Sequence, residues 1–186
     1  ELQLTISNLK NKNSSGPDKI STRLLKECGD VLSIPLLHVL NKSLCTGIFP
    51  EKMKLARVVP IYKTGDNMLV SNYRPISLLS VFSKVFEKLV YGRVLFFLNK
   101  YNVLYKFQFG FRSGFSSVLA LLEVTEMITN LLNNNCYVLG LFLDLQKAFD
   151  TVDHEILLYK LYHYGIRGTL FTWFKSYLSE RIQFTT

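Results

Sequence analysis

The sequence predicts a mixed α/β fold, and three observations support this prediction. An almost unbroken apolar run at residues 137–143 is typical of a strand buried on both faces. A second apolar stretch, at residues 56–62, is also typical of a strand. Several other segments carry apolar residues at helical spacing. With 186 residues, 48% of them hydrophobic, the chain can bury one sizeable core.

The N-terminal part of the chain is expected to be mainly helical. A loop rich in Ser, Gly and Pro at residues 14–18 leads into a short helix, with Asp18 or Ser21 as candidate caps. Apolar residues at helical spacing over 32–44, followed by a glycine and a proline, predict a core helix. Residues 80–98 combine a broad apolar face with basic residues mostly opposite, which indicates an amphipathic helix whose basic side is available to nucleic acid backbone.

Two antiparallel strands are predicted around a turn that begins at Lys63. The first strand covers residues 56–62, with Pro60 marking an edge or a bulge. Asn72-Tyr-Arg-Pro75 brings the chain back extended, because the residue before a proline avoids the helical region. This pairing holds Lys63 near Arg74, and two fixed cations suit a triphosphate. Spacing alone still favours ordinary solvated side chains at both positions.

An aromatic loop, Gln108-Phe-Gly-Phe-Arg-Ser-Gly-Phe115, precedes a helix expected from about Ser116 to Leu132. Its glycines permit close backbone approach, its aromatic faces can stack on bases, and Arg112 can meet a phosphate or a sugar. A packed turn is the alternative interpretation, since aromatic residues beside glycine often have that role alone.

The most informative position is Asp144, where the predicted strand at 137–143 ends. A carboxylate at the mouth of a buried strand is costly unless it is compensated, and a divalent cation can compensate it. A turn, or an ion pair with Lys147, is the alternative explanation. The large side chain of Phe149 would suit the wall of a small-ligand pocket beside the metal better than a solvated turn.

The C-terminal residues predict two helices and the start of a strand. Asp153 is a candidate cap for a helix from His154 to Tyr164, and this structural reading competes with a role in the site. A second helix is expected over 168–178, and a strand begins at about Arg181.

Charge is distributed unevenly along the chain. The net charge is +8, but residues 1–114 carry 17 Lys and Arg against 7 Asp and Glu, while residues 115–186 carry 5 against 7. A basic part that meets a polyanion and an acidic part that holds cations suit a polymerase, although solubility alone could account for the lysines.

These motifs resemble reverse transcriptases of non-LTR (LINE-type) retrotransposons. The stretch Phe142-Leu-Asp-Leu-Gln-Lys-Ala-Phe-Asp-Thr-Val-Asp-His154 is similar to that family's first catalytic motif. Residues 56–63, 72–79 and 108–112 resemble its fingers motifs, in the family's order. The resemblance implies a right-hand polymerase fold, with a fingers subdomain at 1–134 and the first part of a palm at 135–186.

The resemblance also implies roles for particular residues. Asp144 and the backbone carbonyl of Leu145 would bind Mg²⁺, two ions in the intact parent, and Asp144 would be catalytic. The implied nucleotide-binding residues are Lys63, Arg74, Gln146 and Phe149, with Phe149 excluding a 2′ hydroxyl. The implied nucleic-acid contacts are Gln108, Gly110, Phe111 and Arg112. Phe115 stands where the family has a basic residue or His, which removes one backbone contact.

The implied partners are an RNA template, a DNA primer, deoxynucleoside triphosphates and the remainder of the same polyprotein. The family's aromatic-Ala-Asp-Asp hairpin does not occur in the sequence, so we expect the isolated chain not to polymerise. A retrotransposon-derived nucleic-acid-binding module and a decayed, non-catalytic remnant are the alternatives.

The expected location is intracellular and reducing, in the cytoplasm and nucleus. Three cysteines, Cys28, Cys45 and Cys136, have no metal-ligand spacing and their odd number argues against a disulfide framework. No apolar run reaches the roughly 18 residues that a membrane span needs. The N-terminus, Glu-Leu-Gln-Leu, looks excised from a longer chain.

Overall fold

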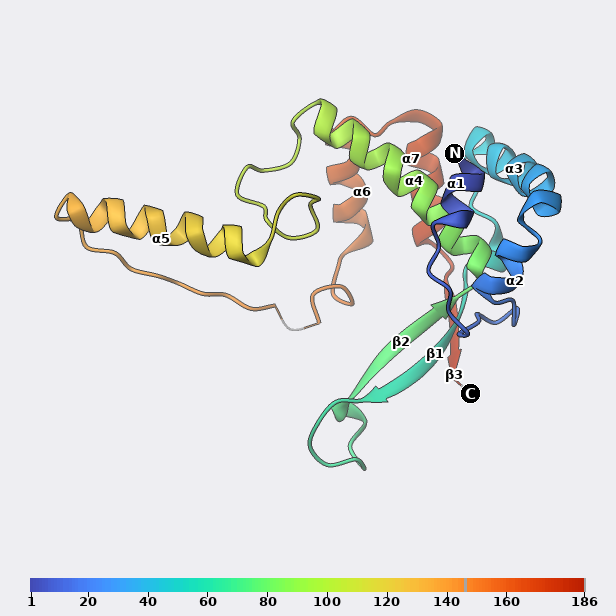
Figure 1. The fold of residues 1–186 in the computed structure, drawn as a ribbon, viewed down its shortest axis with the longest axis horizontal. Helices are drawn as coiled ribbons and strands as arrows, with labels where there is room; N and C mark the ends of the chain where they lie inside the picture. The colour runs from blue at the N-terminus through green and yellow to red at the C-terminus, as the bar shows by residue number, and fades with distance from the viewer. Residues whose placement is uncertain (146, 186) are drawn as a thin grey trace. The chain divides into compact units, whose positions relative to one another are not determined.

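The computed structural model describes residues 1–145 and 147–185 and divides the chain into two compact units (Figure 1). The discontinuous unit comprises Glu1–Phe96 together with the residues from Asp153 onward, and the inserted unit is Phe97–Val152. The boundary between the expected fingers and palm, at residue 134, stays a prediction. The two units are described separately below.

The discontinuous unit contains most of the regular structure. Its helices are α1 (Leu2–Ser7), α2 (Thr22–Glu27), α3 (Gly29–Thr46), the greater part of α4 (Val81–Lys100), α6 (His154–His163) and α7 (Gly168–Leu178). Its strands are β1 (Leu55–Tyr62), β2 (Tyr73–Leu79) and β3 (Ile182–Thr185), with short 3-10 turns at Glu51–Met53 and Val70–Asn72. The inserted unit contains the end of α4 and the helix α5 (Ser117–Asn133). The mixed α/β class is therefore confirmed.

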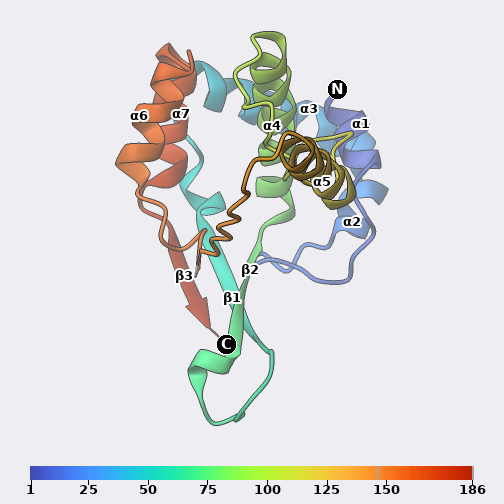
Figure 2. The same cartoon turned by 90° about the vertical axis from the view of Figure 1, so that its left-hand side faces the viewer.

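The sheet of the discontinuous unit has the order β2-β1-β3, with β1 in the middle (Figure 2). β1 pairs antiparallel with β2 over Ala56–Tyr62, which confirms the predicted hairpin, and parallel with β3 over Leu55–Val58. Pro60 lies opposite Pro75 and beyond the end of the β3 pairing. A proline has no N–H to donate, so this edge position costs the ladder no hydrogen bond on the β3 side.

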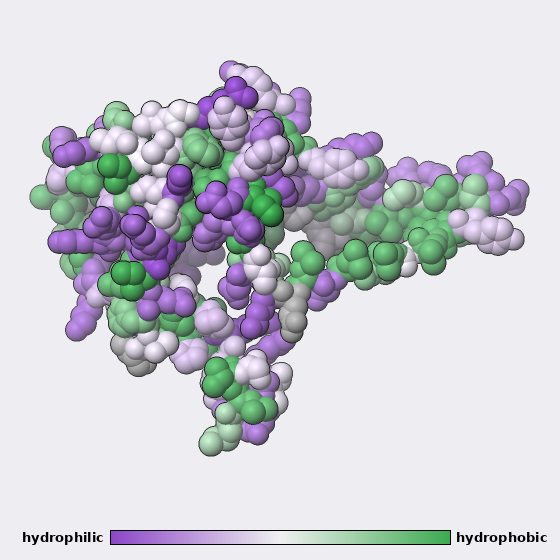
Figure 3. All heavy atoms as spheres, turned by 180° about the vertical axis from the view of Figure 1, so that it is seen from behind, coloured by the Kyte–Doolittle hydropathy of each residue, from purple (hydrophilic) through white to green (hydrophobic). Residues whose placement is uncertain are grey.

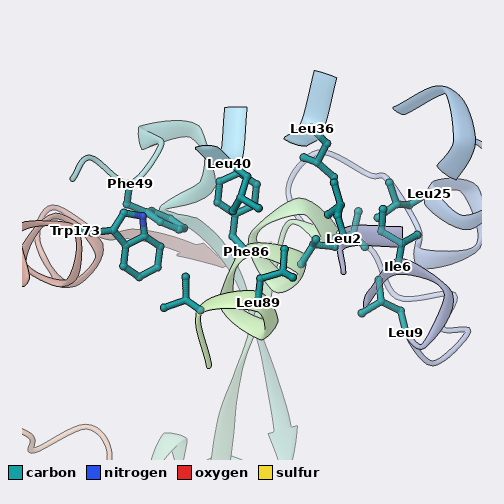
Figure 4. Close-up of a cluster of buried hydrophobic side chains, with 13 residues drawn as sticks. Leu2, Ile6, Leu9, Leu25, Leu36, Leu40, Phe49, Phe86, Leu89 and Trp173 are labelled. Atoms are coloured by element: carbon teal, nitrogen blue, oxygen red, sulfur yellow. The ribbon is translucent and has the colours of Figure 1, made fainter. Parts of the chain in front are cut away.

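The hydrophobic core joins α1, α2, α3, α4 and α7 of the discontinuous unit (Figure 4). Trp173 of α7 is 1% exposed and packs edge-on against Phe49 at 5.3 Å between ring centroids. Phe49 also makes an edge contact with Phe86 of α4 at 6.4 Å. The remaining buried members are Leu2, Ile6, Leu9, Leu25, Leu36, Leu40, Val81, Val85, Leu89 and Val90. Three aromatic rings therefore tie the C-terminal helix to the N-terminal half of the chain.

Trp173, Ser43 and Tyr177 place polar groups in or beside this core, and each of these groups has a hydrogen-bond partner. The indole Nε1 of Trp173 donates to Ser43 Oγ at 3.0 Å, and that hydroxyl donates to the carbonyl of Ile48 at 2.6 Å. The Tyr177 hydroxyl donates to Glu87 Oε1 at 3.0 Å. Burial, reinforced by the charge of Glu87, raises the pKa of Tyr177 to about 12, so this hydroxyl keeps its proton and remains a donor.

The loop at residues 14–18 is fastened to the junction of β2 and α4. A Cβ added to Gly16 would lie 2.6 Å from the backbone of Leu79 and Ser80, so only glycine fits there without displacement. The Ser80 hydroxyl donates to Asp18, whose other oxygen accepts from the backbone N–H of Ile20 at 3.1 Å. The loop thereby fixes where the hairpin meets α4.

The sequence signals for helix ends are confirmed at several positions. Ser21 caps α2 and Ser116 caps α5, each accepting from a backbone N–H at 3.2 Å. Gly47 ends α3 in the left-handed conformation, with a φ of 70°. Asp153 caps α6, its Oδ1 accepting from the N–H groups of Glu155 at 2.8 Å and Ile156 at 3.1 Å.

We expect Asp153→Ala to lower the free energy of unfolding by about 1 kcal/mol, the usual cost of losing an N-cap. Urea unfolding followed by circular dichroism measures the change. Asp150→Ala removes the same charge three residues earlier and should leave stability within about 0.5 kcal/mol. Equal losses in both variants would mean that net charge, and not the cap, is responsible.

The prediction of a buried strand at residues 137–143 is wrong. No strand is formed there, and all seven residues are exposed. A strand that is apolar on both faces needs neighbouring strands at its edges and cover on each face. Within the described residues of the inserted unit, α5 is the main regular element, and most of its apolar side chains are themselves exposed (Figure 3). The described residues of the inserted unit therefore form no strand with which this segment could pair.

Among the helices that the structure describes, none combines the length and the apolar composition that crossing a bilayer requires.

Candidate nucleotide and nucleic-acid site

The β1–β2 hairpin places Lys63 and Arg74 on one face. Ile61 pairs with Arg74, and the N–H of Lys63 donates to the carbonyl of Asn72 at 2.9 Å, so the ladder continues one step past the strands. Lys63 and Arg74 are thus diagonal neighbours, and such residues lie roughly 7–8 Å apart on the same side of an antiparallel pair. The predicted pairing of the two strands is confirmed, it places the two residues on one face, and both side chains are exposed.

The turn between these strands is held by internal hydrogen bonds. Asn72 Nδ2 donates to the carbonyl of Asp66 at 2.7 Å, and Asp66 Oδ1 accepts from the N–H of Met68 at 2.9 Å. Gly65 has a φ of 99°, and a Cβ there would meet Asn72 Nδ2 at 2.7 Å. The Tyr62 hydroxyl donates to the carbonyl of Gly65. These contacts fix the backbone from which Lys63 projects.

Neither cation of the hairpin is neutralised within the residues that the structure describes, since Lys63 and Arg74 lie in no ion pair there. An ammonium group and a guanidinium fork on one face present two kinds of donor to an anion with several oxygens. Ordinary solvation of both side chains remains compatible with their exposure.

The aromatic loop of the inserted unit is organised around Arg112. Its Nη1 donates to the carbonyls of Tyr105 at 3.1 Å and Gln108 at 3.4 Å. Its guanidinium also lies 4.1 Å from the ring centroid of Phe115. Gln108 Nε2 donates to the carbonyl of Gly110 at 3.4 Å. The unusual Phe115 thus stacks on Arg112, a contact that reasoning from the sequence missed.

Phe111 and Phe149 are brought together across the inserted unit. Their ring centroids are 6.0 Å apart with an interplanar angle of 85°, although the residues are 83% and 79% exposed. Phe111 has a φ of 61°, a left-handed conformation that costs a bulky residue about 1–2 kcal/mol. Strain of this kind is concentrated at functional sites, which makes the exposed aromatic pair a candidate surface for a base or a sugar.

Asp144 and Leu145 lie exposed in the extended segment that follows α5. Among the described residues the Asp144 carboxylate has no hydrogen-bond or ion-pair partner, so the alternative of pairing with Lys147 is not realised there. The predicted nucleotide-binding residue Gln146 lies outside the described residues. A turn follows, in which the N–H groups of Asp150 and Thr151 donate to the carbonyl of Lys147 at 2.9 and 3.1 Å.

The carboxylate environment differs from the prediction. Asp144 is solvated and does not sit at the mouth of a buried strand, so its charge needs no compensating cation in this structure. In the part of the chain that the structure describes, no three side chains of His, Cys, Asp or Glu come within reach of one metal ion.

A hairpin face with two cations and a loop with exposed aromatic rings are features with which proteins can bind nucleotides and nucleic acid. Residues 61–186 match the family described as reverse transcriptase (RNA-dependent DNA polymerase), and the chain belongs to this family. The resemblance inferred from the motifs is confirmed. Enzymes of this family generally use a divalent metal.

The relatives include polymerases of insect mobile elements. The chain is 35% identical over 182 residues to the RNA-directed DNA polymerase from mobile element jockey of Drosophila melanogaster, covering 97% of this chain and 20% of the relative. It is 32% identical over 188 residues to the probable RNA-directed DNA polymerase from transposon BS of the same organism, covering 97% and 20%. It is 34% identical over 172 residues to the probable RNA-directed DNA polymerase from transposon X-element of that organism, covering 92% of this chain and 19% of the relative. The chain thus spans about a fifth of these relatives.

Proposed function

We propose that this chain contributes the fingers, residues 1–134, and the first part of the palm, residues 135–186, to an RNA-directed DNA polymerase. The polymerase would extend a DNA primer on an RNA template with deoxynucleoside triphosphates. The observation that carries the proposal is the shared face of Lys63 and Arg74 on the hairpin of a chain from the reverse transcriptase family.

In this proposal Lys63 and Arg74 bind the phosphates of the incoming nucleotide. Lys63 acts as a point charge, and Arg74 as a planar fork that binds two oxygens at once. Phe149 lies beneath the sugar and excludes a 2′ hydroxyl by its bulk, and Gln146 lines the same turn. Gln108, Gly110, Phe111 and Arg112 support the primer and template, with the ring of Phe111 available for stacking.

Asp144 and the carbonyl of Leu145 would hold Mg²⁺. The donors fit this ion in kind, because Mg²⁺ takes hard oxygen ligands and is usually bound by one or two carboxylates, several waters and substrate phosphates. Two such ions supply activation of the primer hydroxyl and stabilisation of the triphosphate charge. The residues at hand provide only part of that coordination, so further carboxylates must come from elsewhere in the polyprotein.

The proposal is tested by primer extension on an RNA template with the complete polypeptide that contains this chain. We expect Lys63→Gln and Arg74→Gln each to raise KM for the deoxynucleotide about tenfold, because each removes one charge-assisted contact to a phosphate. Lys52→Gln, which removes an exposed lysine next to β1, is the matched control and should leave KM within about twofold.

A KM that does not respond to Lys63 or Arg74 would contradict the proposal. If the wild-type polypeptide binds RNA but extends no primer, the alternative of a nucleic-acid-binding module without catalysis is favoured, because the surplus of lysines and arginines in residues 1–114 suffices for binding.

A further inference from the structure

A second basic surface lies in the discontinuous unit, formed by residues outside the hairpin. A pocket of about 550 Å³ opens between the end of α1, the segment that follows it, and one face of α4. Its lining residues are Asn8, Leu9, Lys10, Lys12, Thr22, Lys84, Glu87, Lys88 and Tyr91. Four lysines against a single glutamate give this pocket, called here the lysine pocket, a strongly positive lining.

The lysine pocket has a fixed frame. Leu9 is 7% exposed and belongs to the core, so it anchors the backbone next to Lys10. Thr22 is also 7% exposed, at the first position of α2. Lys84 and Lys88 are four residues apart on α4, which places them on one helical face about 6 Å apart along the axis. The lining therefore combines two buried residues with lysines from two segments of the chain.

The lysines of the lysine pocket are not paired with carboxylates in the part of the chain that the structure describes. The one acidic lining residue, Glu87, accepts from Ser83 Oγ at 3.2 Å and from the Tyr177 hydroxyl at 3.0 Å through the same oxygen. Four ammonium groups against one carboxylate leave the lining with a surplus of positive charge. Such a surplus favours a polyanion, whose binding releases condensed counterions.

Tyr91 points to the kind of polyanion. It lies three residues beyond Lys88 on α4, lines the same pocket, and is 58% exposed. A basic track beside an exposed aromatic ring is the arrangement that binds single strands, with phosphates on the cations and a base on the ring. A duplex offers no free base face to such a ring.

We propose that the lysine pocket binds single-stranded RNA, namely a stretch of the template strand. Lys10, Lys12, Lys84 and Lys88 contact its phosphates, and Tyr91 stacks on a base. The choice of RNA rests on the proposed function, whereas the charge and the aromatic ring are properties of this chain alone. The pocket would hold the RNA without reading its sequence.

The test is fluorescence anisotropy of a labelled single-stranded RNA of mixed sequence, titrated with this chain at several salt concentrations. We expect Lys84→Gln/Lys88→Gln to weaken binding about tenfold at 0.1 M salt. We also expect the slope of log affinity against log salt to become shallower by about 1.4, roughly 0.7 for each lost phosphate contact. Tyr91→Leu should weaken binding severalfold with an unchanged slope, because stacking involves no counterion.

The matched control is Lys42→Gln/Lys52→Gln, which removes two exposed lysines outside the pocket and should leave affinity and slope unchanged. Circular dichroism checks that every variant is folded. Equal losses in the two lysine pairs would overturn the proposal, because general charge would then explain binding. Binding of anionic phospholipid vesicles that is weakened by Lys84→Gln/Lys88→Gln, while RNA binding is not, would also overturn it. Tighter binding of duplex DNA than of single-stranded RNA through the pocket would do the same.

These outcomes are separable from those of the polymerase test. If Lys63 and Arg74 do not affect KM but the lysine pocket binds RNA, the proposed function fails and the pocket stands as a nucleic-acid site. If KM responds to replacement of Lys63 and of Arg74, but the variants of Lys84/Lys88 and Lys42/Lys52 lose RNA affinity equally, the proposal for the lysine pocket is wrong. The proposed function is then unaffected.

Discussion

Replacing Trp173 by alanine is expected to lower the free energy of unfolding by about 3–5 kcal/mol, the usual range for deleting a buried large aromatic side chain. Trp173 is 1% exposed, meets Phe49 edge-on at 5.3 Å and stacks with Tyr177 at 5.4 Å. Truncation would leave a cavity where α3, α4 and α7 meet and would remove the hydrogen bond to Ser43. A loss of this size is a large part of the stability of a typical domain.

The measurement is urea unfolding followed by far-UV circular dichroism, because Trp173 is the one tryptophan of the sequence and its fluorescence disappears with it. Trp173→Phe keeps most of the apolar volume but not the N–H donor, so it should lower the free energy of unfolding by less than the alanine variant does. It also provides a measurable variant if Trp173→Ala does not fold. A loss below about 1 kcal/mol for alanine would mean that the helices pack without this side chain.

Asp144→Asn is expected to reduce primer extension by the complete polypeptide about a hundredfold or more. The proposed role of Asp144 is to hold divalent metal, and the charge stabilisation that such metals supply is worth several kcal/mol, with each 1.36 kcal/mol being about tenfold in rate. Because the carboxylate is exposed and unpaired among the described residues, its replacement should change stability by less than about 0.5 kcal/mol. The effect should therefore appear in the rate and not in folding.

Asp150→Asn provides the comparison, because it neutralises a second exposed carboxylate six residues later. Its primer extension should stay within severalfold of the wild type. Retention of activity by Asp144→Asn would rule out the metal-binding role, and similar losses in both variants would indicate that the charge of the whole turn matters.

Local signals predicted most of the regular structure. The helix over 168–178 was predicted at its observed bounds, and the hairpin followed from the turn after Lys63 and the extended residue before Pro75. Caps, turns and prolines act on residues only a few positions away, so their effects can be predicted from the sequence alone. The failure at 137–143 has a different cause. An apolar run indicates what a segment would bury, but the presence of neighbouring strands is a tertiary property.

The candidate site divides in the same way. The proximity of Lys63 and Arg74 depends on one turn and was predictable. The contact between Phe111 and Phe149, the stacking of Arg112 on Phe115, and the lysine pocket depend on how distant segments pack. The one available signal for the pocket was the basic side of the helix at 80–98, and nothing local connects it with Lys10 and Lys12.

The parallel pairing of β3 with β1 has a consequence for the order of events during synthesis. β3 joins residues 182–185 to residues 55–58, and Trp173 completes a core whose other members come mostly from the first 90 residues. During synthesis the N-terminal helices and the hairpin therefore leave the ribosome well before α7 and β3, which complete the core and the sheet. Contacts of such long sequence separation form slowly. The N-terminal apolar surfaces would stay accessible to chaperones until α7 has emerged.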